Sequence, residues 1–166
     1  MWPTDPDEFE PQHIEPDGVD NGDAWYFVFS KGEILCKTEG GVLDPVTADD
    51  FRWFDMQITS KHFLGYYLNR PCFAVAANGT ATQGFALMGL RNLLGRTNQS
   101  LFYLAGRAKQ IIEWHETHQF CSRCGESMHD HEADRAKECP SCKLISYPRL
   151  SPSIIVLITK GEEMLL

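Results

Sequence analysis

Three absences in the 166-residue sequence narrow the class of protein before any motif is considered. No uninterrupted apolar run approaches the roughly 18–20 residues that a membrane helix needs, so we expect no transmembrane segment. The N-terminus is acidic and lacks the apolar h-region of a signal peptide, so we expect a cytoplasmic protein. Basic residues do not gather into a stripe, which argues against a nucleic-acid-binding surface.

The net charge of −8 is unevenly distributed along the chain. Residues 1–23 contain eight Asp or Glu, four Pro and no Lys or Arg, whereas the remaining residues are neutral overall. A segment with like charges and little apolar area gains little by folding. We therefore expect residues 1–23 to form an acidic, disordered tail that limited proteolysis removes first.

What the chain does contain is enough apolar material, 43% of its residues, for one ordinary domain with a small appended module. Residues 25–36 hold two apolar runs around Gly32, a pattern typical of a β-hairpin with a positive-φ glycine at its turn. Residues 62–77 repeat the pattern, with residues 69–71 predicted at the turn. Phe, Tyr and Val favour strands in both segments, so we expect a small β-rich sheet within residues 24–118.

The clearest helix is predicted from about Ser100 to His118, and Asn98 or Ser100 can cap it. Its apolar residues recur at the 3.6-residue spacing of one helix face. The residues on that face are Leu101, Leu104, Ala105, Ala108, Ile111, Ile112 and His115. Before the helix, residues 84–96 predict a strand or loop that passes into a short helix. Residues 154–166 predict a strand, a turn and the start of a second strand.

Four of the six cysteines form two Cys-x-x-Cys pairs, Cys121 with Cys124 and Cys139 with Cys142, separated by fourteen residues. Each pair lets a tight turn point both sulfurs at one ion, and four thiolates complete a tetrahedral shell with Zn–S distances near ~2.3 Å. In a reducing compartment such pairs are metal ligands more often than disulfides. The spacing therefore predicts one structural Zn²⁺. Metal binding would supply folding free energy on the order of 10 kcal/mol to a module with few core-forming side chains.

Other interpretations of the cysteines and nearby histidines stay open at this point. A rubredoxin-like iron site shares the Cys-x-x-Cys-Gly and Cys-Pro-x-Cys patterns. A catalytic zinc would need an open coordination position, which four cysteines do not leave. His129 and His131, between the two pairs, are expected to be solvent-exposed loop residues. Cys36 and Cys72 are expected to be buried small apolar residues in the predicted strands.

The sequence after the second pair, CPSCKLISYPRLSPSIIVLI, resembles the zinc-ribbon exit of the NADH pyrophosphatases, a family of Nudix hydrolases. There the ribbon is followed by Tyr-Pro-Arg, a short polar step, a Pro and the first Nudix strand. Here these are residues 147–149, Pro152 and the strand from Ile154. Upstream, LFYLAGRAKQIIEWHETHQFCSRCG is similar to the family's helix and its entry into the ribbon, and ALMGLRNLL to the segment before that helix. The resemblance is good over residues 84–166 and weak before them.

The resemblance implies an α+β fold. We expect a small β-rich N-terminal domain (24–118), with one long helix leading into a four-cysteine zinc ribbon (119–150), and then the first strands of an incomplete Nudix domain (151–166). It also implies a homodimer that hydrolyses the pyrophosphate of NADH or NAD to a nicotinamide mononucleotide and AMP. Some family members remove NAD caps from RNA. In the catalytic domain, Mg²⁺ or Mn²⁺ would neutralise the phosphate charge and activate water.

The family's catalytic metal ligands lie in the Nudix box, Gly-x5-Glu-x7-Arg-Glu-x-x-Glu-Glu-x-Gly, and the 166 residues contain no such motif. We therefore expect no catalytic residue in this chain and a chain truncated near the start of the Nudix domain, inactive by itself. The resemblance carries over three substrate contacts: Arg91 before the long helix, Asp134 in the ribbon loop, and Tyr147. Arg91 could pair with a phosphate and Tyr147 could stack on the nucleotide. Asp134 stands where a glutamate is expected, and Glu132 lies close to it in the sequence.

One other class of function remains, a zinc-ribbon module that binds nucleic acid or protein. The ribbon loop GESMHDHEADRAKE carries five acidic and two basic residues, which opposes contact with a phosphate backbone. Titration against RNA at several salt concentrations separates this alternative from a dinucleotide-binding role. A rubredoxin-like electron carrier, in contrast, would be a coloured protein.

Overall fold

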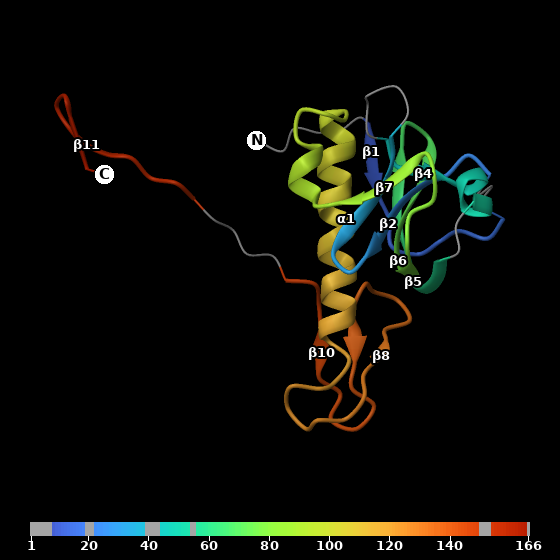
Figure 1. The fold of residues 1–166 in the computed structure, drawn as a ribbon. Helices are drawn as coiled ribbons and strands as arrows, with labels where there is room; N and C mark the ends of the chain where they lie inside the picture. Colours follow the sequence, from blue (N-terminus) through green and yellow to red (C-terminus); the bar gives the residue numbers. More distant parts are fainter. Residues whose placement is uncertain (1–7, 19–21, 39–43, 54–55, 150–153, 166) are drawn as a thin grey trace.

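The computed structural model describes residues 8–18, 22–38, 44–53, 56–149 and 154–165 (Figure 1). Its main sheet has seven strands: β1 (Phe9–Pro11), β2 (Trp25–Ser30), β3 (Glu33–Lys37), β4 (Val46–Thr47), β5 (Met56–Tyr67), β6 (Arg70–Gly79) and β7 (Phe85–Met88). Their order is β1-β5-β6-β2-β3-β7, with β4 pairing on β2. β2 and β6 run parallel, and the other neighbouring strands run antiparallel. Two 3-10 helices, η2 (Ala48–Trp53) and η3 (Leu90–Leu93), and the helix α1 (Gln99–Thr117) surround this sheet.

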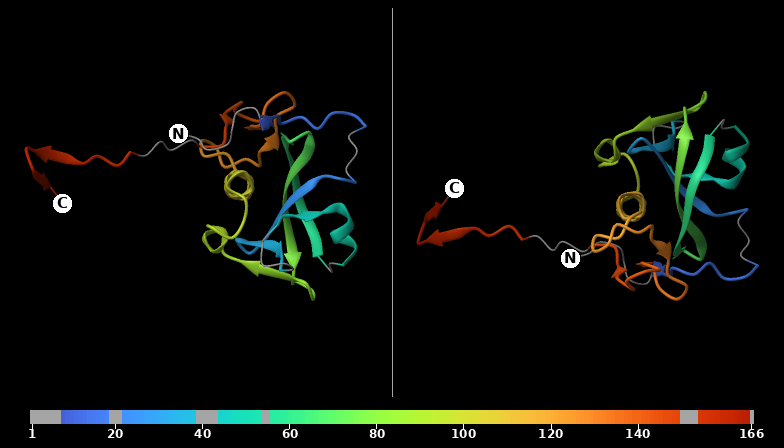
Figure 2. Two further views of the ribbon diagram at one scale, coloured as in Figure 1. Left: turned by 90° about the horizontal axis from the view of Figure 1, so that it is seen from above. Right: turned by 90° about the horizontal axis from the view of Figure 1, so that it is seen from below.

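The sheet is buried on both faces, and its strands alternate between two cores. On β6, Cys72 and Ala74 pack in the core beneath α1, whereas Phe73 and Val75 pack in the core on the opposite side. Figure 2 looks along α1 and shows the helix on one face of the sheet and η2 on the other. Small side chains beneath the helix let α1 lie close to the sheet. Cys36 and Cys72 are fully buried in this core, as predicted.

α1 begins and ends close to the predicted bounds. The side chain of Asn98 accepts hydrogen bonds from the backbone N–H groups of Ser100 (2.8 Å) and Leu101 (3.4 Å), which confirms the predicted N-cap. All of the predicted apolar face is buried except His115, which is half-buried. β7 and η3 precede the helix, as the strand-to-short-helix prediction required.

Two tight turns join the hairpins of the sheet. In the β2–β3 turn Lys31 (φ 50°) and Gly32 (φ 82°) both adopt positive φ, as predicted for Gly32. In the β5–β6 turn the positive-φ residues are Leu68 (φ 49°) and Asn69 (φ 62°), so the turn lies earlier than the predicted residues 69–71. Paired positive φ values suit the twist of a two-residue hairpin, and the ring of Pro71 excludes such values. Pro71 therefore falls inside β6.

β1 lies within the acidic segment, and it corrects the prediction of a disordered tail over residues 1–23. It pairs antiparallel with β5, with Phe9 opposite Tyr67. Phe9 also packs against the core beneath α1. The prediction is therefore wrong for residues 8–18, while residues 1–7 and 19–21 lie outside the described residues. The edge of β5 offers unpaired backbone groups, and a short strand with one large apolar side chain can satisfy them despite its charge.

A glycine in β5 makes room for β1. Gly65 adopts φ +122°, next to an irregularity in the β5–β6 register. A Cβ at this position would lie 2.0 Å from Glu10 O and 2.7 Å from Gln12 N, both backbone atoms of the segment that crosses it. No side chain fits at that distance, so glycine is required for this close approach of two backbones.

The remaining strands form two small sheets. β8 (His129–Asp130), β9 (Lys137–Glu138) and β10 (Ile145–Ser146) form a three-stranded ribbon at the C-terminal end of α1 (Figure 1). β11 (Ile158–Lys160) and β12 (Glu163–Leu165) pair with each other. The strand predicted from Ile154 thus begins four residues later, because residues 154–157 are exposed and have no ladder partner among the described residues. Among the described residues, no helix has the length and apolarity that crossing a bilayer demands. The fold is α+β, as predicted.

Candidate metal centre and ribbon loop

α1 leads directly into the first of two similar cysteine turns. In the first turn Gly125 N donates to Cys121 O (2.9 Å), and in the second Lys143 N donates to Cys139 O (3.0 Å). The residue after each Cys-x-x-Cys pair adopts positive φ: 78° at Gly125 and 58° at Lys143. Each turn therefore has the same backbone shape and directs two sulfurs to one side.

The four predicted ligands come together. The Sγ atoms of Cys121, Cys124, Cys139 and Cys142 all lie within 4.8 Å of one another. The separations are 3.5 Å for Cys121–Cys142, 3.5 Å for Cys124–Cys139 and 3.7 Å for Cys124–Cys142. A regular tetrahedron with Zn–S bonds of about 2.3 Å has edges of about 3.8 Å, whereas a disulfide needs about 2.05 Å. The arrangement therefore fits one tetrahedral ion and excludes disulfides between these pairs.

Two of the four sulfurs, those of Cys121 and Cys139, accept backbone N–H groups. Arg123 N donates to Cys121 Sγ (3.4 Å) and Cys142 N donates to Cys139 Sγ (3.5 Å). The bond from Cys142 N–H lowers the pKa of the Cys139 thiol against the opposing effect of burial. Met128 and Leu144 pack beside the cluster and form its small apolar core. Four sulfurs leave no open position for a substrate or water, so such a site stabilises the fold rather than catalysing a reaction.

Arg135, in the part of the ribbon loop (residues 125–138) between β8 and β9, holds that loop against the main sheet. Its guanidinium donates to the carbonyl oxygens of Gln12 (2.9 Å) and Phe63, at the end of β1 and within β5. His13 Nε2 donates to Ala133 O at 2.7 Å, in the same loop. Burial, and then the charge of Arg107, lower the pKa of Arg135 to about 10, so the side chain stays charged at neutral pH. The N-terminal segment and the ribbon therefore hold each other in place.

Two of the three predicted substrate contacts meet on the ribbon. Tyr147 Oη donates to Asp134 Oδ2 at 3.1 Å, and this bond raises the pKa of the Tyr147 hydroxyl. Asp134 N in turn donates to His131 Nδ1 at 3.2 Å. Tyr147 is 53% exposed, so its ring is accessible while its hydroxyl is held. His131, predicted to be exposed, is partly buried, whereas His129 is exposed as predicted.

Arg91 lies elsewhere in the chain. It is an exposed residue of η3, beside the N-terminal half of α1, whereas the ribbon follows the C-terminal end of that helix (Figure 1). A single chain therefore does not bring Arg91 together with Asp134 and Tyr147. Asp134 and Tyr147 are both exposed, so this pair faces solvent.

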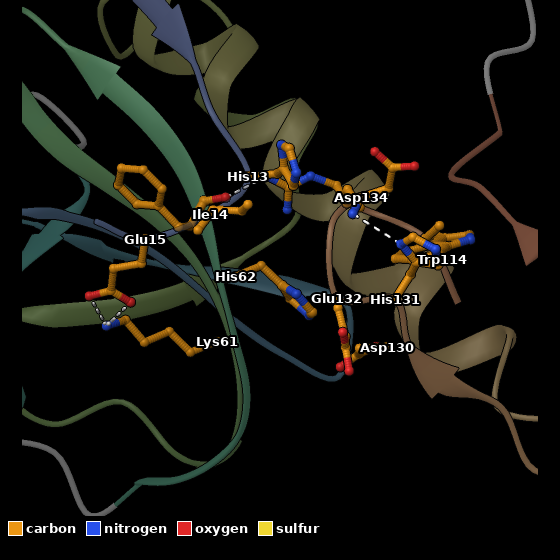
Figure 3. A pocket seen from close by; sticks show the side chains of 13 residues that line it. His13, Ile14, Glu15, Lys61, His62, Trp114, Asp130, His131, Glu132 and Asp134 are labelled. Atoms are coloured by element: carbon orange, nitrogen blue, oxygen red, sulfur yellow. Dashed lines mark hydrogen bonds and ion pairs between the residues drawn. The ribbon is translucent and has the colours of Figure 1, made fainter. Parts of the chain in front are cut away.

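A cavity of about 250 Å³ lies where the β1–β2 connection, β5, the end of α1 and the ribbon loop meet (Figure 3). His62 lines this cavity, and behind it the ring of His115 lies 4.6 Å from that of His62 between centroids, at an interplanar angle of 62°. His62 Nε2, His115 Nδ1 and Trp114 Nε1 are buried and have no hydrogen-bond partner among the described residues. Asp130 Oδ1 lies 3.7 Å from His115 Nδ1 and 3.8 Å from Lys137 Nζ.

Few of these contacts could be predicted from local patterns in the sequence. Only His115 carried a signal, because its position on the apolar face of α1 indicated that it points inward. Arg135 and His62 stand in segments whose partners are distant in the chain, and no local pattern distinguishes them from exposed polar residues. Gly65 could have been identified as a glycine interrupting a strand, which often marks a close backbone approach.

Comparison with known proteins extends the resemblance to most of the chain. The model of the NADH pyrophosphatase-like rudimentary NUDIX domain matches residues 23–114, and that of the NADH pyrophosphatase zinc ribbon domain matches residues 116–147. The first match includes β2 to β7 of the main sheet, where the sequence alone showed only a weak resemblance.

Among curated proteins, the NAD-capped RNA hydrolase NudC of Deinococcus radiodurans is 37% identical over 147 residues, covering 84% of this chain and 47% of the relative. The protein of the same name from Stutzerimonas stutzeri is 37% identical over 144 residues, covering 86% and 51%. That from Pseudomonas syringae is 31% identical over 157 residues, covering 92% and 52%. The chain spans about half the length of the curated relatives it matches. Because one family model covers most of the N-terminal part and a second covers the four-cysteine ribbon, the chain belongs to the NADH pyrophosphatase family of zinc-ribbon Nudix proteins.

Proposed function

We propose that these 166 residues are the N-terminal and zinc-ribbon portion of a NADH pyrophosphatase, which hydrolyses NADH or NAD to a nicotinamide mononucleotide and AMP. The observation that carries the proposal is the ribbon itself. Its closed four-cysteine cluster holds together the loop that carries Asp134 and the segment after β10 that carries Tyr147, and these two side chains are hydrogen-bonded to each other. The relatives named NAD-capped RNA hydrolases support NAD-linked substrates, including capped RNA.

Within this proposal the ribbon binds one Zn²⁺ through its four cysteines, and the ion has a structural role. The ribbon strands are only two residues each, and the apolar cluster around the sulfurs is small. Such a module has too little buried area to fold alone, so metal binding supplies the missing free energy. The zinc thereby fixes the loop that carries Asp134.

Tyr147 is the residue of this chain that we assign to nucleotide contact. An exposed aromatic ring stacks on a base with about 1–3 kcal/mol, and the bond to Asp134 restricts the ring to fewer orientations. Arg91 would contact a phosphate through its planar fork of donors. Because Arg91 lies at the other end of α1, it belongs to a different part of the site, and the expected homodimer is one way to supply it near Tyr147.

The hydrolytic step requires groups outside these 166 residues. A Nudix box would hold Mg²⁺ or Mn²⁺, and no such motif is present in the sequence. Glu163 belongs to β12, which pairs with β11, and Glu162 lies in the turn before it, so the two carboxylates do not form a shared metal site. We therefore propose that the chain binds the dinucleotide weakly and does not turn it over by itself.

The test measures binding and turnover separately in the zinc-loaded chain. Titration with NADH and with AMP should show weak binding that Tyr147→Ala abolishes, whereas Phe120→Ala, at another exposed aromatic residue of the ribbon region, should leave it unchanged. Incubation with NADH and Mn²⁺ should release no more AMP than a metal-only control. Binding that is insensitive to the Tyr147 substitution would contradict the assigned contact. Turnover above the control would contradict the proposal that this chain does not hydrolyse NADH by itself.

The alternative of a nucleic-acid-binding ribbon gains no support from the surface of the loop. Its five acidic residues remain on or near the surface, and the anchoring Arg135 is engaged with backbone carbonyls. RNA binding that falls steeply with added salt would nevertheless favour that alternative. A cytoplasmic location and a homodimeric state remain predictions of the proposal.

A further inference from the structure

The junction between the main sheet and the ribbon contains a cluster of basic groups that the proposed nucleotide contact does not use. His62 of β5 is surrounded by His115 of α1 and by Arg135 and Lys137 of the ribbon, with Asp130 of β8 as the carboxylate nearest to them. We propose that this cluster is an acid-sensitive latch: protonation of His62 and His115 weakens the attachment of the ribbon to the sheet. The latch is a property of the fold and stands independently of the nucleotide contact.

The geometry of the two imidazoles favours their neutral forms. At 4.6 Å between ring centroids they pack edge to face, an arrangement that suits neutral aromatic rings. His62 Nε2 and His115 Nδ1 are both buried without a hydrogen-bond partner among the described residues. Adding a proton to each ring would place two positive charges at this separation, with the exposed carboxylate of Asp130, 3.7 Å from His115 Nδ1, as the nearest opposite charge, which is unfavourable.

The charged groups around the two imidazoles are mostly positive. Asp130 is 69% exposed at its side chain and is shared between His115 and Lys137, at 3.7 and 3.8 Å. Lys137 is almost fully buried, so its ammonium group already relies on the Asp130 carboxylate for its charge interaction. Arg135 adds a second permanent positive charge close to His62.

The other carboxylates that line the cavity are engaged or screened. Glu15 pairs with Lys61 at 3.2 Å, across the β1–β2 connection and β5. Asp134 accepts the hydrogen bond from Tyr147. Glu132 is exposed on the ribbon loop, where water and salt weaken its effect on a buried group. His13 and His131, the remaining titratable groups at the cavity, are engaged with the ribbon-loop backbone.

The direction of the pH effect follows from the pKa shifts. Burial, and then the charges of His115 and Arg135, lower the pKa of His62 to about 4, and burial also lowers the pKa of His115. When the ribbon is released, both rings are hydrated and recover ordinary pKa values near ~6.5. Because the attached state has the lower pKa, its neutral rings are favourable above pH ~6.5, and attachment weakens as the pH falls from ~6.5 towards ~4.

The size of the effect can be expressed as a ratio of populations. For His62 alone, a pKa of about 4 in the attached state and ~6.5 in the released state raises the released fraction roughly tenfold between pH 7.5 and pH 5.5. The bonds that break on release are those that Arg135 makes to Gln12 O and Phe63 O and that His13 makes to Ala133 O. Residues 131–137 should therefore report the opening.

Hydrogen exchange on the zinc-loaded chain tests the latch, with zinc retention followed by a chromophoric chelator. After correction for intrinsic exchange rates, amides of residues 131–137 should exchange about tenfold more readily at pH 5.5 than at pH 7.5. His62→Phe keeps an aromatic ring against His115 without a titrating group, and it should reduce this ratio to about twofold or less. His129→Gln, at an exposed histidine of the same ribbon, should respond like the wild type.

Several outcomes would overturn the latch. They are an equal acid response in the wild type and His62→Phe, an acid response that coincides with zinc release, and the absence of any response in the wild type. Should His62→Phe fail to fold, NMR titration of the wild-type imidazoles decides the matter without a variant. An ordinary titration midpoint near ~6.5 for His62 in the folded chain would refute the proposal, and a midpoint well below 6 would support it.

Discussion

Substitution of Gly65 by alanine should detach the N-terminal segment from the sheet. A Cβ at this position would lie 2.0 Å from Glu10 O and 2.7 Å from Gln12 N, and both atoms are backbone, so no side-chain rotation relieves the contact. The positive φ adds about 1–2 kcal/mol of strain for any residue with a Cβ. Displacement of β1 removes the bonds from Gln12 N to Leu64 O and from Leu68 N to Glu8 O, at about 1 kcal/mol each. The free energy of unfolding should therefore fall by about 3–4 kcal/mol, a large share of the roughly 5–15 kcal/mol of an ordinary domain.

Urea unfolding of the zinc-loaded chain measures this loss, and limited proteolysis locates it. Gly65→Ala should make residues 8–18 accessible to protease, while wild-type β1 stays protected. Gly95→Ala is the matched control, because Gly95 also has positive φ (+72°) but open space around its Cβ position. The control should lose only about 1–2 kcal/mol and keep β1 protected. If both variants lose the same stability, or if β1 remains protected in Gly65→Ala, the close approach of β1 to β5 is not what requires glycine here.

Three further outcomes test other parts of the structure. Cys124→Ser should abolish stoichiometric zinc binding, as measured by elemental analysis, and it should raise the rate of hydrogen exchange throughout the ribbon while exchange in β2 and β6 stays slow. Retained zinc would contradict the four-sulfur shell. Burial raises the pKa of the Cys36 and Cys72 thiols to about 12, so a thiol reagent at pH 8 should label them only in step with urea unfolding, and rapid labelling of the native chain would show that they are accessible. Asn98→Ala should lower the free energy of unfolding by about 1 kcal/mol in the same urea assay, and Asn98→Ser by much less, since serine also caps helices; equal losses would show that the cap bond is not the cause.

The elements that the sequence predicted are those specified by neighbouring residues. The two Cys-x-x-Cys pairs determine their own turns, and the apolar spacing of α1, together with Asn98 at its cap, determines where the helix lies and which side faces inward. Gly32 likewise marks a turn that needs no distant partner. In each case the residues that make the structure are within one or two helical turns of each other in the chain, so a local pattern is sufficient evidence.

The elements that the sequence missed depend on contacts between distant segments. The acidic composition of residues 8–18 indicates that they interact well with water, but it does not reveal that the open edge of β5 is available to pair with them. The role of Arg135 depends on β1 and β5, which are distant in the chain, so in the sequence it cannot be distinguished from an ordinary loop residue. His62 likewise differs from an exposed histidine only because α1 and the ribbon bury it. Of the predicted substrate contacts, Asp134 and Tyr147 could be placed together because the ribbon is small. The position of Arg91 relative to them depends on the whole fold.

The attachment of β1 has a consequence for the order in which the chain folds. Gln12 is synthesised 123 residues before Arg135, whose side chain binds its carbonyl. At roughly 5–20 residues per second, about 6–25 s pass between the synthesis of Gln12 and that of Arg135. During that interval β1 covers the edge of β5 only through its own strand pairing, and an uncovered edge could pair with another nascent chain. The eight acidic residues within residues 1–23 would oppose such pairing, because they repel the same segment of a neighbouring chain before the native contacts exist.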